Sequence, residues 1–170
     1  MDEVATRSRI EKHIDLDKAI ADLSTNKVLK VGWVEKNRYP EEQGGEYVAQ
    51  VAAKHEYGYG VPPRPFMGPA IANNSFAWLE MINKGMKKVI NGKANILDVL
   101  NKVGARAAGD VAKAIRAVTS PSLSPATILA RYLRLTSKSA RKKGVTATLE
   151  KPLIDTGIMF RSVTHAIEDE

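Results

Sequence analysis

The sequence predicts an α+β protein: a small, mainly antiparallel sheet packed by several helices, with an extended proline-rich arm and long loops. Three observations lead to this fold class. Two segments with many β-branched residues, 27–36 and 160–168, lie far apart in the chain. Between them, several segments carry apolar residues at three- and four-residue steps, the spacing of amphipathic helices. Prolines and glycines separate these segments, as expected for connecting loops.

The N-terminal quarter predicts a loose end, a helix and a strand. Residues 1–9 are polar with mixed charge, and we expect them to be loose. Apolar residues fall near helical spacing over 10–23. The segment 27–36 (KVLKVGWVEK) has the composition of a strand, and 40–45 that of a turn or loop.

Three further helices are predicted in the middle of the chain. The first spans 46–57 and stops at Gly58. The second spans 70–90, and its predicted apolar stripe consists of Phe76, Leu79, Ile82, Met86, Val89 and Ile90. The third spans 95–118 and contains Gly104 and Gly109. Each of these glycines costs roughly 1 kcal/mol against alanine in a helix interior. Either a close-packed neighbouring helix or a kink accounts for them.

The C-terminal part predicts a linker at 120–125 and a short helix that begins at Pro125 and runs through Leu133. A basic loop over 134–150 follows, with a short strand at 145–149. The alternating segment 160–168 is predicted as the final strand of the sheet, which we expect to hold one or two further short strands. We interpret residues 1–170 as a single domain, given the chain's length.

A stiff arm over 58–69 is the most distinctive local feature. Each proline in this segment fixes its own φ, lacks an N–H and disfavours helix in the residue before it. Phe66 and Met67 give the arm large apolar surfaces, and Arg64 gives it one charge. Such an arm packs either on its own domain or against another subunit. For the second alternative the interface residues are Pro62, Pro63, Arg64, Pro65, Phe66 and Met67.

Two motifs carry a resemblance to a known family. The segment at 55–71 (HEYGYGVPPRPFMGPAI) is similar to the signature of the neck or tail-completion (head–tail joining) proteins of long-tailed bacteriophages. The segment at 151–162 (KPLIDTGIMFRS) looks like the closing signature of the same family, and the order and separation of the two blocks also fit. Together they cover about a sixth of the chain. The chain departs from the family around 132–150, where a shorter link is expected.

The resemblance implies a structural virion protein of the phage neck, without catalytic activity. Such a protein completes the tail and joins or stabilises the head–tail interface as a homo-oligomeric ring, for which we expect a homohexamer. Its implied partners are copies of itself, other neck and tail proteins and, non-specifically, genomic DNA in the channel of this connector. The implied location is the virion, with the host cytoplasm as the place of virion assembly. One alternative is a tail terminator or tail-tube-associated structural protein, and another is a basic DNA-binding accessory protein in packaging.

Composition bounds the chemistry. The chain has no cysteine, so disulfides, zinc thiolates and thiol nucleophiles are excluded, and the absence fits a reducing cytoplasm. No apolar run approaches the roughly 20 residues that span a bilayer, and the N-terminus has no apolar signal-peptide segment, so we expect no contact with membrane. The formal net charge of +7 favours an anionic partner.

No residue pattern indicates an enzyme, a cofactor or a metal. His13, His55 and His165 lie far apart in the sequence, and no metal-ligand or nucleophile motif surrounds them. Asp155, Thr156 and Gly157 are interpreted as a structural turn, with Asp155 accepting backbone N–H groups and positioning the final strand. We therefore expect no catalytic activity.

The basic loop offers four cations for contact with DNA phosphates or an acidic partner: Lys138, Arg141, Lys142 and Lys143. It contains no aromatic residue to read bases, so contact with DNA would be independent of sequence. A solvated charged loop is the alternative interpretation.

Overall fold

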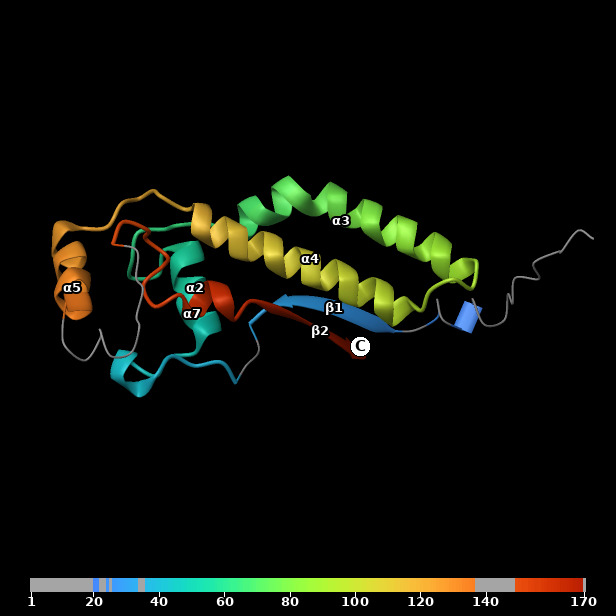
Figure 1. Cartoon of the computed structure of the whole chain (residues 1–170), viewed down its shortest axis with the longest axis horizontal. Helices are drawn as coiled ribbons and strands as arrows, with labels where there is room; N and C mark the ends of the chain where they lie inside the picture. Colours follow the sequence, from blue (N-terminus) through green and yellow to red (C-terminus); the bar gives the residue numbers. More distant parts are fainter. Residues whose placement is uncertain (1–19, 22–23, 25, 34–35, 137–148, 170) are drawn as a thin grey trace, which may run out of the picture.

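The computed structural model describes residues 20–21, 24, 26–33, 36–136 and 149–169 (Figure 1). Two strands and several helices make up this part of the chain, so the predicted α+β class is confirmed. In chain order the elements are β1 (Lys27–Gly32), the 3₁₀ helix η1 (Glu41–Gln43), α2 (Val48–Tyr57), α3 (Met67–Ile90), α4 (Ile96–Ala117), α5 (Pro125–Thr136), α7 (Ile158–Arg161) and β2 (Thr164–Asp169).

The long helix α4 lies between α3 and the sheet (Figure 1). Strands β1 and β2 pair antiparallel, with Leu29 opposite Ile167 and Val31 opposite His165. This confirms the antiparallel pairing of the first and last predicted strands, although in the described residues the sheet has these two strands and no third. Because one sheet face packs on α4, the alternation of side chains places Lys30 on the opposite face.

Two glycines explain how closely these layers approach. A Cβ atom on Gly85 of α3 would lie 2.2 Å from Val99 Cγ1 of α4, and one on Gly104 would lie 2.5 Å from His165 Cδ2 of β2. The neighbour of Gly104 is therefore a strand, where a helix or a kink was expected. Gly109 faces open space, so close packing does not account for it.

At the other end of α4, the helices α2, α5 and α7 gather (left in Figure 1). Here a core cluster joins residues from α2, the arm, α3, α4 and the 151–162 segment: Val48, Ala52, Phe66, Ala70, Val111, Ile115, Leu153 and Met159. Since α4 takes part in this cluster and in the packing on the sheet, it connects the two ends of the molecule.

Helix α3 differs from the prediction in two ways. It begins at Met67, before Pro69, because a proline is tolerated in the first turn, where no N–H is needed. Its predicted stripe was wrong at Phe76 and Leu79, which are exposed, with Phe76 at 80%. The helix has two apolar faces, and the one containing Ala70 and Val89 is buried.

The other boundaries agree more closely. Helix α2 ends at Gly58, which has a φ of +80°, and α4 begins directly after Asn95, whose side chain caps the helix by accepting from the Leu97 N–H. Helix α5 begins at Pro125 as predicted but continues to Thr136, so the first residues assigned to the basic loop are helical. The final strand was wrong at its start: 158–161 forms α7 and β2 begins at Thr164. Most of the helix predicted over 10–23 and nearly all of the strand over 145–149 lie outside the described residues.

Candidate functional site

The two motif blocks, far apart in the sequence, meet at the α2, α5 and α7 end of the molecule. Phe66 of the first block is 1% exposed and shares the core cluster with Leu153 and Met159 of the second. Trp33 joins them, because its Nε1 donates to the Met159 carbonyl over 2.8 Å and its ring meets Phe66 edge-on at 5.9 Å between centroids. The motif residues thus form much of the interior at this end.

The arm folds back on α2. The Arg64 N–H donates to the His55 carbonyl over 2.7 Å, and Gly58 makes the reversal possible with its positive φ. Arg64 and Phe66 are buried in their own chain, Met67 is half-buried, and Pro62, Pro63 and Pro65 are exposed. The expectation that Phe66 offers its surface to another subunit is therefore corrected, because its own core already covers it. The exposed prolines keep their place as interface candidates.

Glu56 of α2 supports the start of α3. Its carboxylate accepts the backbone N–H groups of Phe66, Met67 and Gly68 over 2.7, 2.9 and 2.9 Å. A helix begins with four N–H groups that have no partner within the helix. Glu56 accepts three of them, and the fourth position is Pro69, which has no N–H. The negative charge also lies at the positive end of the helix dipole.

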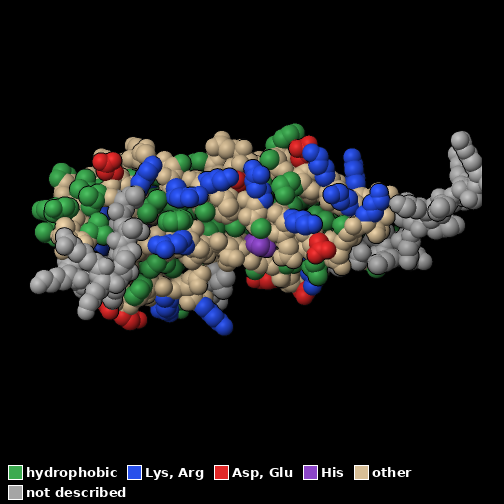
Figure 2. Space-filling model, in the orientation of Figure 1, with side chains coloured by type: hydrophobic (Ala, Val, Ile, Leu, Met, Phe, Trp, Pro, Cys, Tyr) green, Lys and Arg blue, Asp and Glu red, His purple; other side chains and the backbone are tan. Residues whose placement is uncertain are grey.

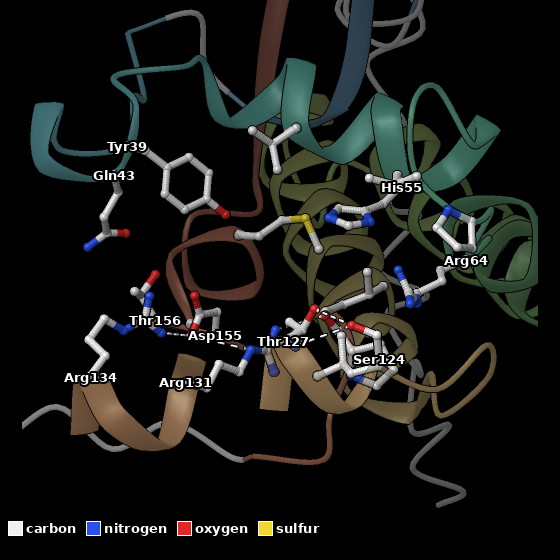
Figure 3. A pocket seen from close by; sticks show the side chains of 18 of the residues that line it. Tyr39, Gln43, His55, Arg64, Ser124, Thr127, Arg131, Arg134, Asp155 and Thr156 are labelled. Carbon is white, nitrogen blue, oxygen red and sulfur yellow. Dashed lines mark hydrogen bonds and ion pairs between the residues drawn. The ribbon is translucent and has the colours of Figure 1, made fainter. Parts of the chain in front are cut away.

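A cavity of about 840 Å³ opens beside this core (Figure 3). Its wall comes from both motif blocks and from α5, and the labelled side chains of His55, Arg131 and Asp155 point into it. By size it falls within the range of small-molecule pockets. It is the strongest candidate for a site in the described part of the chain.

Two buried arginines in the cavity wall hold loop carbonyls. Arg64, 5% exposed, donates from Nε to the Pro121 carbonyl over 2.8 Å and from Nη2 to the Ser122 carbonyl over 3.2 Å. Arg131, 7% exposed, donates to three carbonyls of the second motif block: those of Lys151, Pro152 and Ile154. Both guanidinium groups thus donate to backbone oxygens of irregular loops, of which that of Lys151 also accepts the Ile154 N–H over 3.1 Å.

Asp155 pairs with arginines of α5. It forms an ion pair with Arg134, and its Oδ1 lies 3.6 Å from Arg131 Nε. The expectation that Asp155 accepts turn N–H groups is replaced by these pairs. Gly157 has the predicted positive φ of +77°, but the turn that it closes leads into α7 rather than directly into the last strand.

Burial shifts two ionisable groups in the cavity wall. Burial, with the charges of Arg64, Arg131 and Lys54, lowers the pKa of His55 below its usual 6.5, and its buried Nδ1 has no hydrogen-bond partner. Burial and the charge of Asp155 raise the pKa of Tyr39 to about 12. Both side chains are therefore neutral at pH 7, and the fixed charges around them are paired with backbone or with one another. This arrangement fixes loops in place, and it lacks a paired nucleophile and base.

The remaining sequence candidates are placed as follows. Lys138, Arg141, Lys142 and Lys143 lie outside the described residues. Within the described ranges, no group of three His, Asp or Glu side chains is arranged to hold a metal ion. In the same ranges no helix is both long enough and apolar enough to cross a bilayer.

Sequence reasoning missed Glu56 and Arg131. In the sequence, Glu56 looks like an ordinary charged residue near a helix end. Arg131 belongs to a helix whose other charged residue, Arg134, is exposed. No pattern in the sequence distinguishes the buried arginine from the exposed one, because the difference depends on where the 151–162 segment lies in space.

The comparisons with known proteins add no family: the chain matches no family model, and neither a curated protein nor a solved structure shows significant similarity to it.

Proposed function

We propose that the chain is a structural protein of the phage neck that completes the tail and joins or stabilises the head–tail interface as a homo-oligomeric ring. The family part of this proposal comes from the two motifs. The two motifs lie in one core cluster, and this supports the family part, because residues that maintain a shared fold are expected to pack together. The core role of Phe66 and Met159 also gives a physical reason for these residue types at these positions.

The assembly part rests on one observation: the subunit exposes apolar side chains in two separate places. The α3 patch consists of Ile71, Phe76 and Leu79, and the α5 patch consists of Leu129, Tyr132 and Leu133. In the α5 patch, Leu129 precedes Tyr132 and Leu133 by three and four residues, and in the α3 patch Phe76 precedes Leu79 by three, which are the spacings of neighbours on one helix face. Figure 2 shows apolar side chains gathered at the α5 end of the molecule.

Two different patches on one subunit suit a ring. A ring is built from head-to-tail contacts, in which one surface of each subunit binds a different surface of the next. Helix α5 lies at one end of the molecule and α3 along its length, so the two patches belong to separate elements and provide two such surfaces (Figure 1). Exposed apolar groups of this kind mark interaction sites more often than ordinary surface.

The first test is the mass of the purified full chain by light scattering. We expect a closed oligomer, and Phe76→Ser should shift it toward the monomer without changing the melting temperature. Leu97→Ser is the matched control, because Leu97 is an exposed apolar residue of α4 outside both patches. A monomeric wild-type chain, or equal effects of the two substitutions, would contradict the assembly part.

The second test images particles made without this protein. Tailless heads beside free tails would support joining. Overlong tails would favour the tail-terminator alternative, and normal particles would contradict both.

A further inference from the structure

The exposed side of α4 carries a row of cations. Since α3 covers one side of this helix and the sheet another, a single side remains open to solvent. The open side presents Lys102, Arg106, Lys113 and Arg116, all exposed, which we call the α4 stripe. Their separations of four, seven and three residues keep them on one helix face. Figure 2 shows Lys and Arg side chains in a row along this face of the molecule.

Acidic groups offset only part of this charge. Asp110 lies within the stripe but is buried beneath it, accepting from Trp78 Nε1 over 3.0 Å and from Arg106 Nε over 2.8 Å, with Lys113 3.6 Å away. Burial acts to raise the pKa of Asp110, but these hydrogen bonds and charges outweigh it and hold the pKa below its usual value. Asp98 is exposed one turn before Lys102, at the N-terminal end of the helix. The stripe therefore keeps a net positive charge.

Between the cations of the stripe, α4 presents small residues that project little from the helix. Ala105 and Gly109 stand between the cations, and a Cβ on Gly109 would meet nothing within 4 Å. A groove of about 490 Å³ runs beside the stripe, where Arg106 and Lys113 face Asn73 and Asn74 of α3. An extended anion can therefore approach the helix closely and meet the cations beside the groove.

We propose that the α4 stripe binds the phosphate backbone of double-stranded DNA, without reading sequence. From Lys102 to Arg116 the stripe spans about 21 Å at 1.5 Å per residue, over which duplex DNA carries one negative charge per roughly 1.7 Å of axis. Lysine and arginine contacts to phosphates fix position and carry no sequence information.

Two observations favour duplex DNA over other anionic partners. Sites for single strands combine cations with stacking aromatics, whereas in the described part of the chain one aromatic ring, that of Phe160, lies over a stripe cation. It lies at one end, 5.5 Å from the Arg116 guanidinium and 5.7 Å from that of Arg161. A protein partner would be expected to use apolar anchors, yet between Lys102 and Arg116 helix α4 exposes no large apolar side chain.

This inference does not depend on the proposed neck function, because it concerns the charge of one helix in the isolated chain. It also assigns DNA contact to residues other than the loop at 138–143, so the two surfaces can be separated by mutation.

The test measures binding of the full chain to a labelled duplex of arbitrary sequence by anisotropy, between about 50 and 200 mM salt. Lys102→Gln with Lys113→Gln removes two stripe charges without touching the Arg106–Asp110 pair. Each lost phosphate contact should lower the salt slope by about 1, so the double variant should lower it by about 2. Its affinity at the lowest salt should fall by about tenfold or more.

The matched control is Lys30→Gln with Lys36→Gln, which removes the same charge from residues that line a different surface, on the sheet. A third variant neutralises Lys138, Arg141, Lys142 and Lys143, and melting curves confirm that all variants fold. An unchanged slope in the control with a reduced one in the stripe variant supports the proposal. Equal losses in stripe variant and control, loss only in the loop variant, or no binding of duplex by the wild type at low salt would overturn it.

Discussion

Helix α4 connects two ends of the molecule that are held together by different kinds of contact. Its N-terminal half packs against α3 and the sheet through close backbone approach, where Gly85 and Gly104 leave room for Val99 and His165. Near its C-terminal half, charged side chains hold loops together: Arg64 and Arg131 donate to loop carbonyls, and Glu56 accepts the first N–H groups of α3.

The difference follows from how the backbone N–H and C=O groups find hydrogen-bond partners at each end of the molecule. Regular helices and strands pair their own N–H and C=O groups, so neighbouring elements need only fit in shape. The loops at 120–124 and 151–157 make few regular backbone bonds, so buried side chains must supply partners. Removing such a side chain leaves several polar groups unpaired, whereas altering a glycine contact changes packing alone. The predictions below separate these two cases.

The largest effect is expected at Arg131. Arg131→Leu removes the side-chain donor to three carbonyls in the 151–154 segment, of which, within the described residues, only that of Lys151 keeps a backbone N–H, and should lower the free energy of unfolding by about 3–5 kcal/mol. Chemical denaturation measures this loss. The control is Arg134→Leu, since Arg134 is exposed and pairs with the same Asp155, and it should cost about 1 kcal/mol or less. Similar losses for both variants would mean that burial of Arg131 does not matter.

A matched pair of glycines in α4 tests the packing of this helix on the sheet. Gly104→Ala places a methyl group 2.5 Å from His165 Cδ2 and 2.8 Å from Leu29 Cδ1, so it should destabilise the fold by about 1–3 kcal/mol through overpacking. Gly109→Ala makes the same change in open space and should stabilise by about 0.5–1 kcal/mol. Thermal melts measure both variants. Effects of the same sign would show that helix propensity, rather than packing on the sheet, decides the outcome.

These two cases also show what the sequence predicts. Period-based reasoning gave the fold class, the antiparallel pairing of first and last strands and the bounds of α2 and α4 to within about two residues. Local chemistry gave the positive φ of Gly58 and Gly157. These features depend on neighbours in the sequence.

What the sequence did not predict depends on distant neighbours. The α3 stripe was misassigned because both faces of that helix are apolar, and only contact with α4 decides that Val89 is buried and Phe76 exposed. Alternation over 160–168 suggested one strand, but Gly157 first starts the turn of α7. The partners of Glu56 and Arg131 lie ten or more residues away, so no local pattern shows them.

A smaller loss is expected at Glu56, which tests whether the start of α3 depends on charge. Glu56→Gln keeps the shape but removes the negative charge, and should cost about 1 kcal/mol. Glu46→Gln is the control, because Glu46 is an exposed carboxylate that pairs with Lys54 and its loss should be within about 0.5 kcal/mol. Equal effects would show that the three N–H bonds to Glu56 are no stronger than a surface ion pair.

The smallest effect concerns His55 and the pH. Burial, then the charges of Arg64, Arg131 and Lys54, lower the pKa of His55 in the folded chain below the 6.5 of the unfolded chain. Below pH 6.5 the unfolded chain therefore binds more protons than the folded chain, and stability falls as the pH drops toward the folded pKa. Above 6.5 both forms are neutral and this contribution is complete.

Denaturation measured between about pH 5 and 7, above the range where ordinary carboxylates titrate, should show this loss on acidification. His55→Gln, which does not titrate, should flatten the profile while leaving stability at pH 7.5 comparatively little changed. The arginines near His55 remain charged throughout this range, so a profile that stays equally steep in the variant would place the titrating group elsewhere. It would also mean that the cavity wall tolerates a third positive charge, on His55, beside Arg64 and Arg131.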